Sequence, residues 1–214
     1  MSIRRREILA LGLSATVLGP SFAFAEATVQ DVSTDPWQLH DVLELGLEGS
    51  GWQEAESPFS RLPGRAEALV RPPVWNLAQH TAGMSASFRT DATAIRFEVE
   101  LLSSDLAMPH MPATGKSGLD LYARDEKGTW RWVATAQPRQ QNYQATVTGL
   151  APGSREYRVH LPLYNGVTAM KVGVRRGAKF EAIAPRTTQP TVYYGTSIAQ
   201  GACACARSVP TPPS

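Results

Sequence analysis

The feature that most constrains this chain is a period-two alternation of apolar and polar side chains, repeated from about residue 66 onward. Such alternation sends successive side chains to opposite faces of a strand, so that one face packs in a core and the other meets water. It is typical of antiparallel strands rather than of the continuous apolar runs of a parallel sheet. Six stretches share it: 84–88, 95–101, 119–123, 143–147, 157–161 and 170–174.

The connections between these stretches contain turn residues. Residues 125–128 predict a hairpin into the Trp130–Trp132 strand, 151–154 predict a turn, and Asn165-Gly166 is the strongest hairpin signal. We therefore expect an all-β fold, a jelly-roll-like antiparallel β-sandwich, with a barrel as the alternative that the pattern alone leaves open. Little helix is expected over 66–184, and one or two strands with long loops over 26–65.

Residues 1–25 resemble a signal peptide. Three arginines, Arg4–Arg6, precede a short apolar run over 8–18, and Ala23-Phe24-Ala25 fits a cleavage site. The arginines also fit the twin-arginine pattern, and an ordinary secretory signal is the alternative. Either route predicts export to the periplasm or the exterior, with a mature chain that begins at Glu26. The apolar run is short for a bilayer, and no other stretch is long enough to span a membrane.

Charge and cysteine content exclude some functions. The formal net charge of +2 is carried by Arg4–Arg6 against Glu7, so the rest of the chain is balanced and no basic stripe favours nucleic-acid binding. The two cysteines, Cys203 and Cys205, are one residue apart, a spacing that makes a relaxed disulfide between them difficult. They lack nearby partners for a zinc site, so we expect no metal and no cofactor.

One stretch near the C-terminus contains a candidate catalytic residue. Residues 192–201 run from β-forming and aromatic residues into Gly195-Thr196-Ser197 and a second glycine. This order is typical of a strand that ends in a sharp turn before a helix, and a serine on such a turn projects its hydroxyl outward as a nucleophile must. Because Gly-x-Ser turns are common, an ordinary turn remains the alternative on the local pattern alone.

The longer sequence around Ser197 resembles that of a known family. The sequence Tyr-Tyr-Gly-Thr-Ser-Ile-x-Gln-Gly-x-Cys-Ala around Ser197 looks like the first block of SGNH (GDSL-type) hydrolases, in the subfamily with an N-terminal β-sandwich. The resemblance covers roughly 35–204. It implies a jelly-roll module before a hydrolase domain, and Ser197 as the acyl-accepting nucleophile. Further stretches that carry it are 76–83, 87–91, 108–115, 117–122 and 161–166.

The resemblance also implies groups that this sequence does not contain. The family's oxyanion Gly and Asn and its Asp-x-x-His lie in later blocks, whereas here Ser197 is followed by a proline-rich stretch, 209–213, that cannot continue a helix. We therefore expect residues 1–25 to be the signal peptide, 26–186 the sandwich, and 187–214 an unstructured, truncated start of the hydrolase domain, left by a frameshift, an early stop or a gene break.

Four side chains are weighed as sites. His110 lies in a long loop that could face a hydrolase cleft and contact substrate, with local packing as the alternative. His160 alternates outward on its strand, so a solvated surface histidine is expected. Trp130 and Trp132 share one strand face; we expect them in the core, whereas exposure would indicate sugar stacking.

Three functions remain open. The first is the N-terminal domain of an exported SGNH-type esterase that acts on an ester, such as an acetylated carbohydrate, and is inactive as this chain. The second is a stand-alone carbohydrate-binding sandwich, and the third is a structural domain. An uncovered apolar face would favour the first, and an exposed aromatic pair beside a groove the second. The expected partner is thus an ester or a carbohydrate. The sequence does not indicate which oligomeric state the chain adopts.

Overall fold

The computed structural model describes residues 35–52 and 57–188, together with Gly195 and Gln200. The signal peptide expected over 1–25, the nucleophile Ser197, the two cysteines and most of the truncated stretch expected over 187–214 lie outside the described residues. Within the described part, no helix is long and apolar enough to cross a bilayer.

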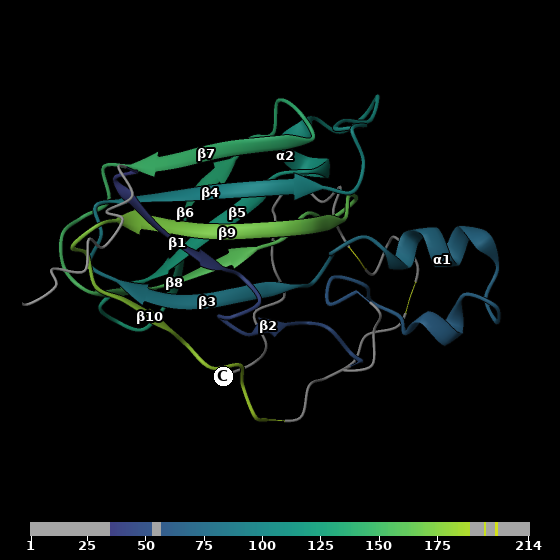
Figure 1. The fold of residues 1–214 in the computed structure, drawn as a ribbon, viewed down its shortest axis with the longest axis horizontal. Helices are drawn as coiled ribbons and strands as arrows, with labels where there is room; N and C mark the ends of the chain where they lie inside the picture. Colours follow the sequence, from purple (N-terminus) through teal and green to yellow (C-terminus); the bar gives the residue numbers. More distant parts are fainter. Residues whose placement is uncertain (1–34, 53–56, 189–194, 196–199, 201–214) are drawn as a thin grey trace, which may run out of the picture. The chain divides into compact units, whose positions relative to one another are not determined.

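Two antiparallel sheets form the domain (Figure 1). The four-stranded sheet has the order β1 (Trp37–Asp41), β9 (Val167–Arg175), β4 (Ala94–Leu101) and β7 (Asn142–Thr148). The six-stranded sheet has the order β10 (Phe180–Ala182), β3 (Ser85–Thr90), β8 (Arg155–His160), β5 (Leu119–Arg124) and β6 (Trp130–Ala136), and β2 (Leu47–Glu48) also pairs with β3. Most chain-consecutive strands lie in different sheets, which confirms the jelly-roll-like sandwich.

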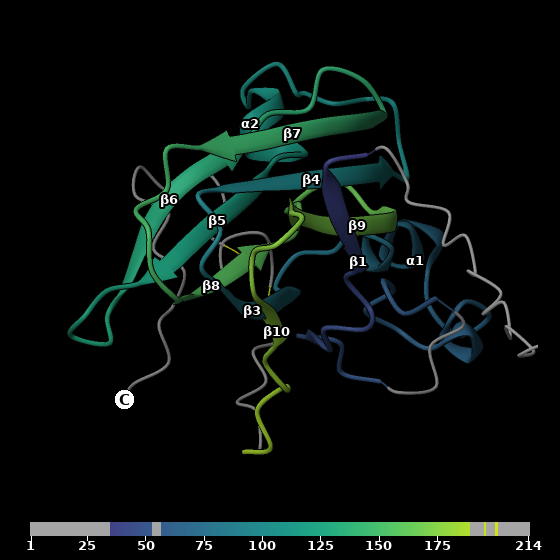
Figure 2. The same cartoon turned by 60° about the vertical axis from the view of Figure 1, so that its left-hand side comes forward.

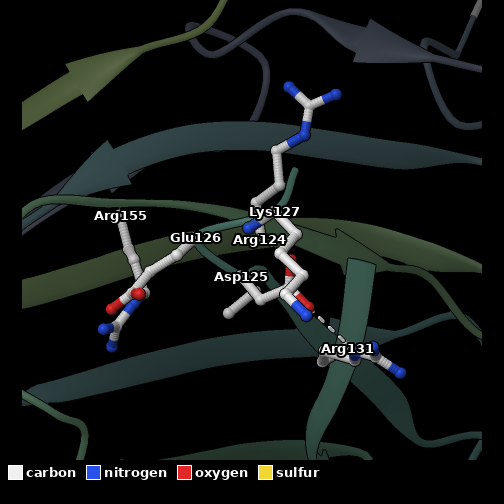
Figure 3. Close-up of a pocket in the computed structure, with 7 residues that line it drawn as sticks. Arg124, Asp125, Glu126, Lys127, Arg131 and Arg155 are labelled. Carbon is white, nitrogen blue, oxygen red and sulfur yellow. Dashed lines mark hydrogen bonds and ion pairs between the residues drawn. The ribbon is translucent and has the colours of Figure 1, made fainter. Parts of the chain in front are cut away.

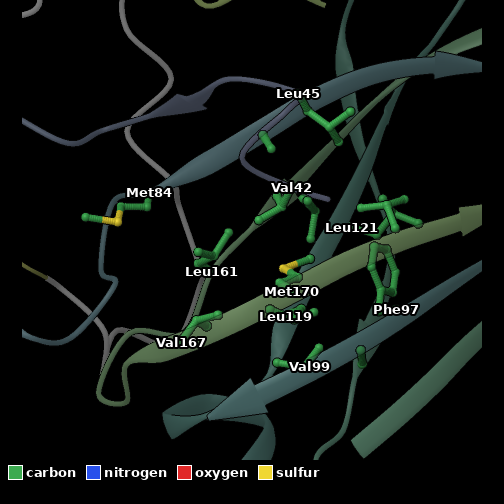
Figure 4. Packing of buried hydrophobic residues seen from close by; sticks show 14 of the residues in the cluster. Val42, Leu45, Met84, Phe97, Val99, Leu119, Leu121, Leu161, Val167 and Met170 are labelled. Carbon is green, nitrogen blue, oxygen red and sulfur yellow. The ribbon is translucent and has the colours of Figure 1, made fainter. Parts of the chain in front are cut away.

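The core lies between the sheets and follows the alternation in the sequence. In β4, Ile95, Phe97 and Val99 are buried, and the residues between them point outward. Each sheet contributes such a face, and the two faces pack against each other to remove apolar area from water. Figure 4 shows the packed side chains; those that are fully buried include Met84, Phe88, Leu119, Leu121, Val159, Met170 and Val172.

Over residues 35–52 and 57–188, helix is confined to short connections. These are a 3₁₀ turn, η1 (Gly64–Ala66), and two α-helices, α1 (Pro72–Ala78) and α2 (Ala113–Lys116). Prolines occupy the first two positions of α1, where the missing backbone N–H groups cost no helical hydrogen bond. The expectation of little helix after residue 66 is confirmed.

One predicted turn is wrong. Asn165-Gly166 does not close a hairpin, because β8 and β9 lie in different sheets and the connection crosses between them. Gly166 is not among the glycines with positive φ. It is needed for space instead: a Cβ there would lie 2.5 Å from the Gln79 carbonyl oxygen. The hairpin predicted over 125–128 is confirmed as the connection between β5 and β6.

The strands run back and forth between two ends of the sandwich (Figures 1 and 2). We call one the loop end; it holds residues 79–84, 102–118, 137–141 and 161–166 and lies beside α1 and α2 in Figure 1. We call the other the hairpin end; it holds residues 91–93, 125–129, 149–154 and 176–179. The loop end has longer connections, and these place the candidate site.

Candidate functional site at the loop end of the sandwich

Asn165 is the centre of the loop end. Its side chain is 1% exposed, and its amide oxygen accepts hydrogen bonds from the backbone N–H of Ser103 (3.1 Å) and Gly166 (2.9 Å). Its amide nitrogen donates to the Ser103 carbonyl (2.9 Å) and to Ser117 Oγ (3.1 Å). These four bonds use the donors and acceptors of the side chain and join three segments of the loop end.

Thr81 ties a fourth segment to the same place. It is fully buried, and its backbone N–H donates to the Asn165 carbonyl at 3.1 Å. Its hydroxyl lies 3.1 Å from the Pro162 carbonyl and 3.2 Å from that of Asn165. Because a buried hydroxyl costs free energy unless it is bonded, this position strongly favours threonine or serine.

A buried lysine supports the connection after β8. Lys116 is 6% exposed, and its Nζ lies 2.6 Å from Asp105 Oδ2, although the Asp105 side chain is 75% exposed. The Lys116 carbonyl accepts from the Tyr164 backbone N–H at 2.9 Å. The lysine therefore serves both as an ion-pair partner and as a backbone anchor.

The stretch Gly118–Tyr122 leads from the loop end into the six-stranded sheet. A Cβ on Gly118 would lie 2.5 Å from the Thr114 carbonyl oxygen, so only glycine fits. Leu119 and Leu121 are buried in the core, and Asp120 and Tyr122 point to the outer face. There Asp120 Oδ1 accepts from Thr135 Oγ1 at 2.6 Å, and the Tyr122 ring meets His160 edge-on at 5.4 Å.

His160 is the last residue of β8 and lies in a cross-strand row of polar residues, Glu48, Ser85, His160 and Asp120. Burial, and to a lesser extent the Arg158 charge, lowers its pKa to about 4 against the opposing charges of Asp120 and Glu48. The outward direction is confirmed, but the expected solvated histidine is wrong, because the ring is half-buried beside Tyr122 and neutral at pH 7.

The expected core position of Trp130 and Trp132 is also wrong. Both lie on the outer face of the six-stranded sheet, and Trp132 is 59% exposed. Trp130 is half-buried beneath the guanidinium groups of Arg158 (4.6 Å from the ring centroid) and Arg124 (5.5 Å). The small side chain of Ala136 takes the inward position in β6 instead.

His110 lies at the tip of a tight turn on the loop end. Met108 and Met111 exchange backbone hydrogen bonds of 2.8 and 3.0 Å around Pro109 and His110, and the histidine is exposed. Since Ser197 lies outside the described residues, a role for His110 toward the serine or a substrate stays a prediction.

Sequence reasoning missed Gln200. Its side-chain amide donates a hydrogen bond to the Leu163 carbonyl at 3.0 Å, so a residue three positions after Ser197 contacts the connection that contains Asn165. No local pattern singles out this contact, because it joins residues far apart in the chain.

The hairpin end, in contrast to the loop end, has a surface lined by charged side chains. A shallow hollow there is lined by Arg124, Asp125, Glu126, Lys127, Arg131 and Arg155 (Figure 3). Arg131 Nε lies 3.0 Å from Asp125 Oδ2, and Asp125 also accepts from two backbone N–H groups of its turn. These contacts lie in and beside the hairpin predicted over 125–128. Within residues 35–52 and 57–188, no three metal-ligating side chains gather.

Four of the family-like stretches thus meet at one end of the sandwich: 76–83, 108–115, 117–122 and 161–166. The contacts of Asn165 and Thr81 link three of them, and 108–115 is joined to 117–122 through α2, where the Ser117 N–H donates to the Ala113 carbonyl at 2.9 Å. The remaining stretch in the sandwich, 87–91, lies in and just after β3. The arrangement offers an ordered polar surface, and its reactive group would have to come from elsewhere.

Comparisons with known proteins agree with this geometry. No curated protein matches the chain. A GDSL-like lipase from Bacteroides ovatus ATCC 8483 is similar in structure, with a TM-score of 0.63 and 24% identity over 68% of this chain and 42% of its own. So is the salicylyl-acyltransferase SsfX3 from a tetracycline biosynthetic pathway, with a TM-score of 0.52 and 18% identity over 73% of this chain and 44% of its own.

These similarities support the fold, and the chain matches less than half the length of either structure. The family model described as GxDLY, the N-terminus of SGNH hydrolase-type esterases, matches residues 37–180. The letters of that motif occur as Gly118, Asp120, Leu121 and Tyr122, the stretch that leads from the loop end into the outer face. The chain therefore belongs to the family that carries the GxDLY N-terminal domain of SGNH-type esterases.

Proposed function

We propose that residues 35–188 are the N-terminal domain of an exported serine esterase in which Ser197 is the acyl-accepting nucleophile. The observation that carries this proposal is the meeting of four family-like stretches at the loop end, where Gln200 also makes contact. In such a reaction, the Ser197 hydroxyl would attack the ester carbonyl, the alcohol would leave, and water would release the acid from the acyl-enzyme.

The hydroxyl needs a base and fixed oxyanion donors to react at neutral pH. All four histidines of the chain precede Ser197, and residues 198–214 contain neither histidine nor aspartate. We therefore expect the purified 214-residue chain to hydrolyse p-nitrophenyl acetate no faster than its Ser197→Ala variant. Clear turnover by the wild-type chain alone would mean that a base such as His110 activates the serine.

A chimera tests the esterase role directly. In it, residues 1–201 precede the remaining blocks of an SGNH-type hydrolase domain, which supply the oxyanion donors and the Asp-x-x-His. We expect the chimera to hydrolyse p-nitrophenyl acetate and the Ser197→Ala version to lose several orders of magnitude in kcat. A folded chimera that is inactive, or whose rate is unchanged by Ser197→Ala, would contradict the proposal.

Export is supported by the arginines, the apolar run and the Ala-x-Ala site of residues 1–25. N-terminal sequencing of material from the periplasm or medium is expected to start at Glu26, and a chain that starts at Met1 there would contradict export.

Exposed Trp132 favours a second candidate function, the binding of carbohydrate. A flat ring that is 59% exposed on a sheet face can stack on a sugar, and Tyr122 is its cross-strand neighbour. Affinity electrophoresis in gels that contain a neutral polysaccharide is expected to retard the wild-type chain more than Trp132→Ala. Equal mobility of the two would count against this function.

A further inference from the structure

We propose that the connection 161–166 is the docking surface for Gln200, which follows Ser197 by three positions in the chain, and that the Leu163 carbonyl is its point of attachment. The occupant is thus a segment of this chain. The inference uses the proposed function only in the role that it gives to Ser197; the docking itself is independent of ester hydrolysis.

The contact that carries the inference is specific in its chemistry. The Gln200 side-chain nitrogen donates to the Leu163 carbonyl oxygen at 3.0 Å. A backbone carbonyl accepts hydrogen bonds and cannot donate, so the position selects a side chain with a donor at this length. Methionine has nearly the same length as glutamine and lacks a donor, which provides a matched variant.

The acceptor is held from both sides. Before it, the Pro162 carbonyl lies 3.1 Å from the hydroxyl of buried Thr81. After it, Tyr164 donates its backbone N–H to the Lys116 carbonyl at 2.9 Å, and Asn165 makes its four side-chain bonds. A site holds its partner accurately only when its own support is fixed, and these contacts supply that support.

The chain is also held where it leaves the sandwich. The Arg186 side chain binds the Glu48 carboxylate through Nε (2.9 Å) and Nη2 (2.7 Å), and its backbone N–H donates to the same carboxylate at 3.2 Å. The stretch from Arg186 to Gln200 can span at most about 50 Å when extended, enough to join the two attachments. Two residues that flank Ser197 in the sequence are therefore attached to the sandwich: Arg186 at Glu48 and Gln200 at Leu163.

Exposed apolar side chains adjoin the docking surface. Leu102 is 48% exposed, and its backbone N–H donates to the Gly166 carbonyl at 2.9 Å. Leu77 is 51% exposed, and its carbonyl accepts from His80, the neighbour of Thr81. Covering such side chains removes apolar area from water, so a segment that docks beside them gains more than one hydrogen bond.

Crosslinking tests the proposal in the full 214-residue chain. Cys205→Ser leaves Cys203, three residues after Gln200, as the single native thiol. A second cysteine is placed by Leu163→Cys at the docking surface or, as the control, by Lys127→Cys in the hairpin at the opposite end. A short bismaleimide should give several-fold more intramolecular crosslink with position 163 than with position 127. Adding Gln200→Met should lower the yield at position 163 to the control level.

Equal yields at the two positions, or a yield at position 163 that Gln200→Met leaves unchanged, would overturn the docking. Hydrogen exchange of residues 161–166 and 195–201 in wild type and Gln200→Met gives a second measurement that needs no new cysteine, and faster exchange in the variant is expected. Repeating the crosslink with Ser197→Ala separates the two proposals: docking should persist in this variant, whereas an inactive chimera would count against the esterase role alone.

Discussion

The two ends of the sandwich differ in what they require of the sequence. At the hairpin end, Gly128, Gly149, Gly153 and Gly177 have positive φ, and a Cβ on any of them would meet nothing within 4 Å. At the loop end, Gly118 and Gly166 lack positive φ but lie against other segments, and Asn165, Thr81 and Ser117 are buried and bonded. The hairpin end depends mainly on turn glycines, with Thr90 and Asp91 bonded to Lys179, whereas the loop end depends on a larger set of buried side chains that meet across the fold.

The largest loss of stability is expected for Asn165→Ala at the loop end. The variant loses four side-chain hydrogen bonds and leaves the buried Gly166 N–H without this partner. We expect it to lower the free energy of unfolding by about 3–4 kcal/mol, measured by urea denaturation. The exposed Asn142 on β7 gives the matched control, and Asn142→Ala is expected to change stability by less than about 0.5 kcal/mol. Similar losses in the two variants would remove the distinction.

The second test uses pH and His160 at the loop end of β8. The unfolded histidine binds a proton near pH 6.5, whereas the folded one does so only at about 4. Between these values the unfolded state holds more protons, so the stability present above pH 6.5 falls as the pH drops. Between pH 7 and 4.5, we expect the free energy of unfolding to fall by about 2–3 kcal/mol less in His160→Gln than in the wild type. Urea denaturation at pH 7 and 4.5 measures it.

Part of the acid sensitivity should remain in that variant, because burial also lowers the pKa of His40 and His80. An identical pH dependence in wild type and His160→Gln would show that the ring is as solvated as an ordinary surface histidine.

The third test is Gly118→Ala. The added Cβ would lie 2.5 Å from the Thr114 carbonyl oxygen and 3.1 Å from that of Ala136, both backbone atoms that cannot move aside cheaply. Overpacking of this kind costs about 2 kcal/mol. Thermal unfolding followed by circular dichroism should show a lower Tm. An unchanged Tm would mean that position 118 is packed less closely against the Thr114 and Ala136 carbonyls than the structure shows.

The smallest effect is expected from Gly128→Ala at the hairpin end. No atom opposes the new Cβ, so the cost comes from φ of 79° alone, about 1 kcal/mol. The same thermal measurement applies. A loss equal to that of Gly118→Ala would indicate that backbone conformation, and not close packing, limits both ends.

The sequence predicts strands well because alternation is a local signal with a direct physical cause. Phe97 and Val99 are buried as their alternation predicts, and the same holds for Val172 and Val174 in β9. Alternation does not say which of two faces is inward when one bears aromatics and the other small residues. This is why Trp132 was expected in the core although it is exposed on the outer face.

The candidate site was predictable only in part. The family resemblance identifies the stretches that meet at the loop end, but not the contacts that join them. Asn165-Gly166 has the local form of a hairpin, and its actual role depends on Ser103 and Ser117, which are distant in the chain. Gln200 belongs to the family-like block around Ser197, but that block does not indicate its partner, which is a backbone carbonyl that any residue could supply.

The side chain of Asn165 also bears on the order of folding. Its partners Ser103 and Ser117 lie 62 and 48 residues away in the chain, and Thr81 lies 84 residues away from it. Contacts of such sequence separation incur a large loop-closure entropy, so they form after the strands that bring them together. The loop end should therefore be among the last parts of the domain to form, and a newly made chain would acquire its attachment for Gln200 only once β3, β5 and β8 are paired.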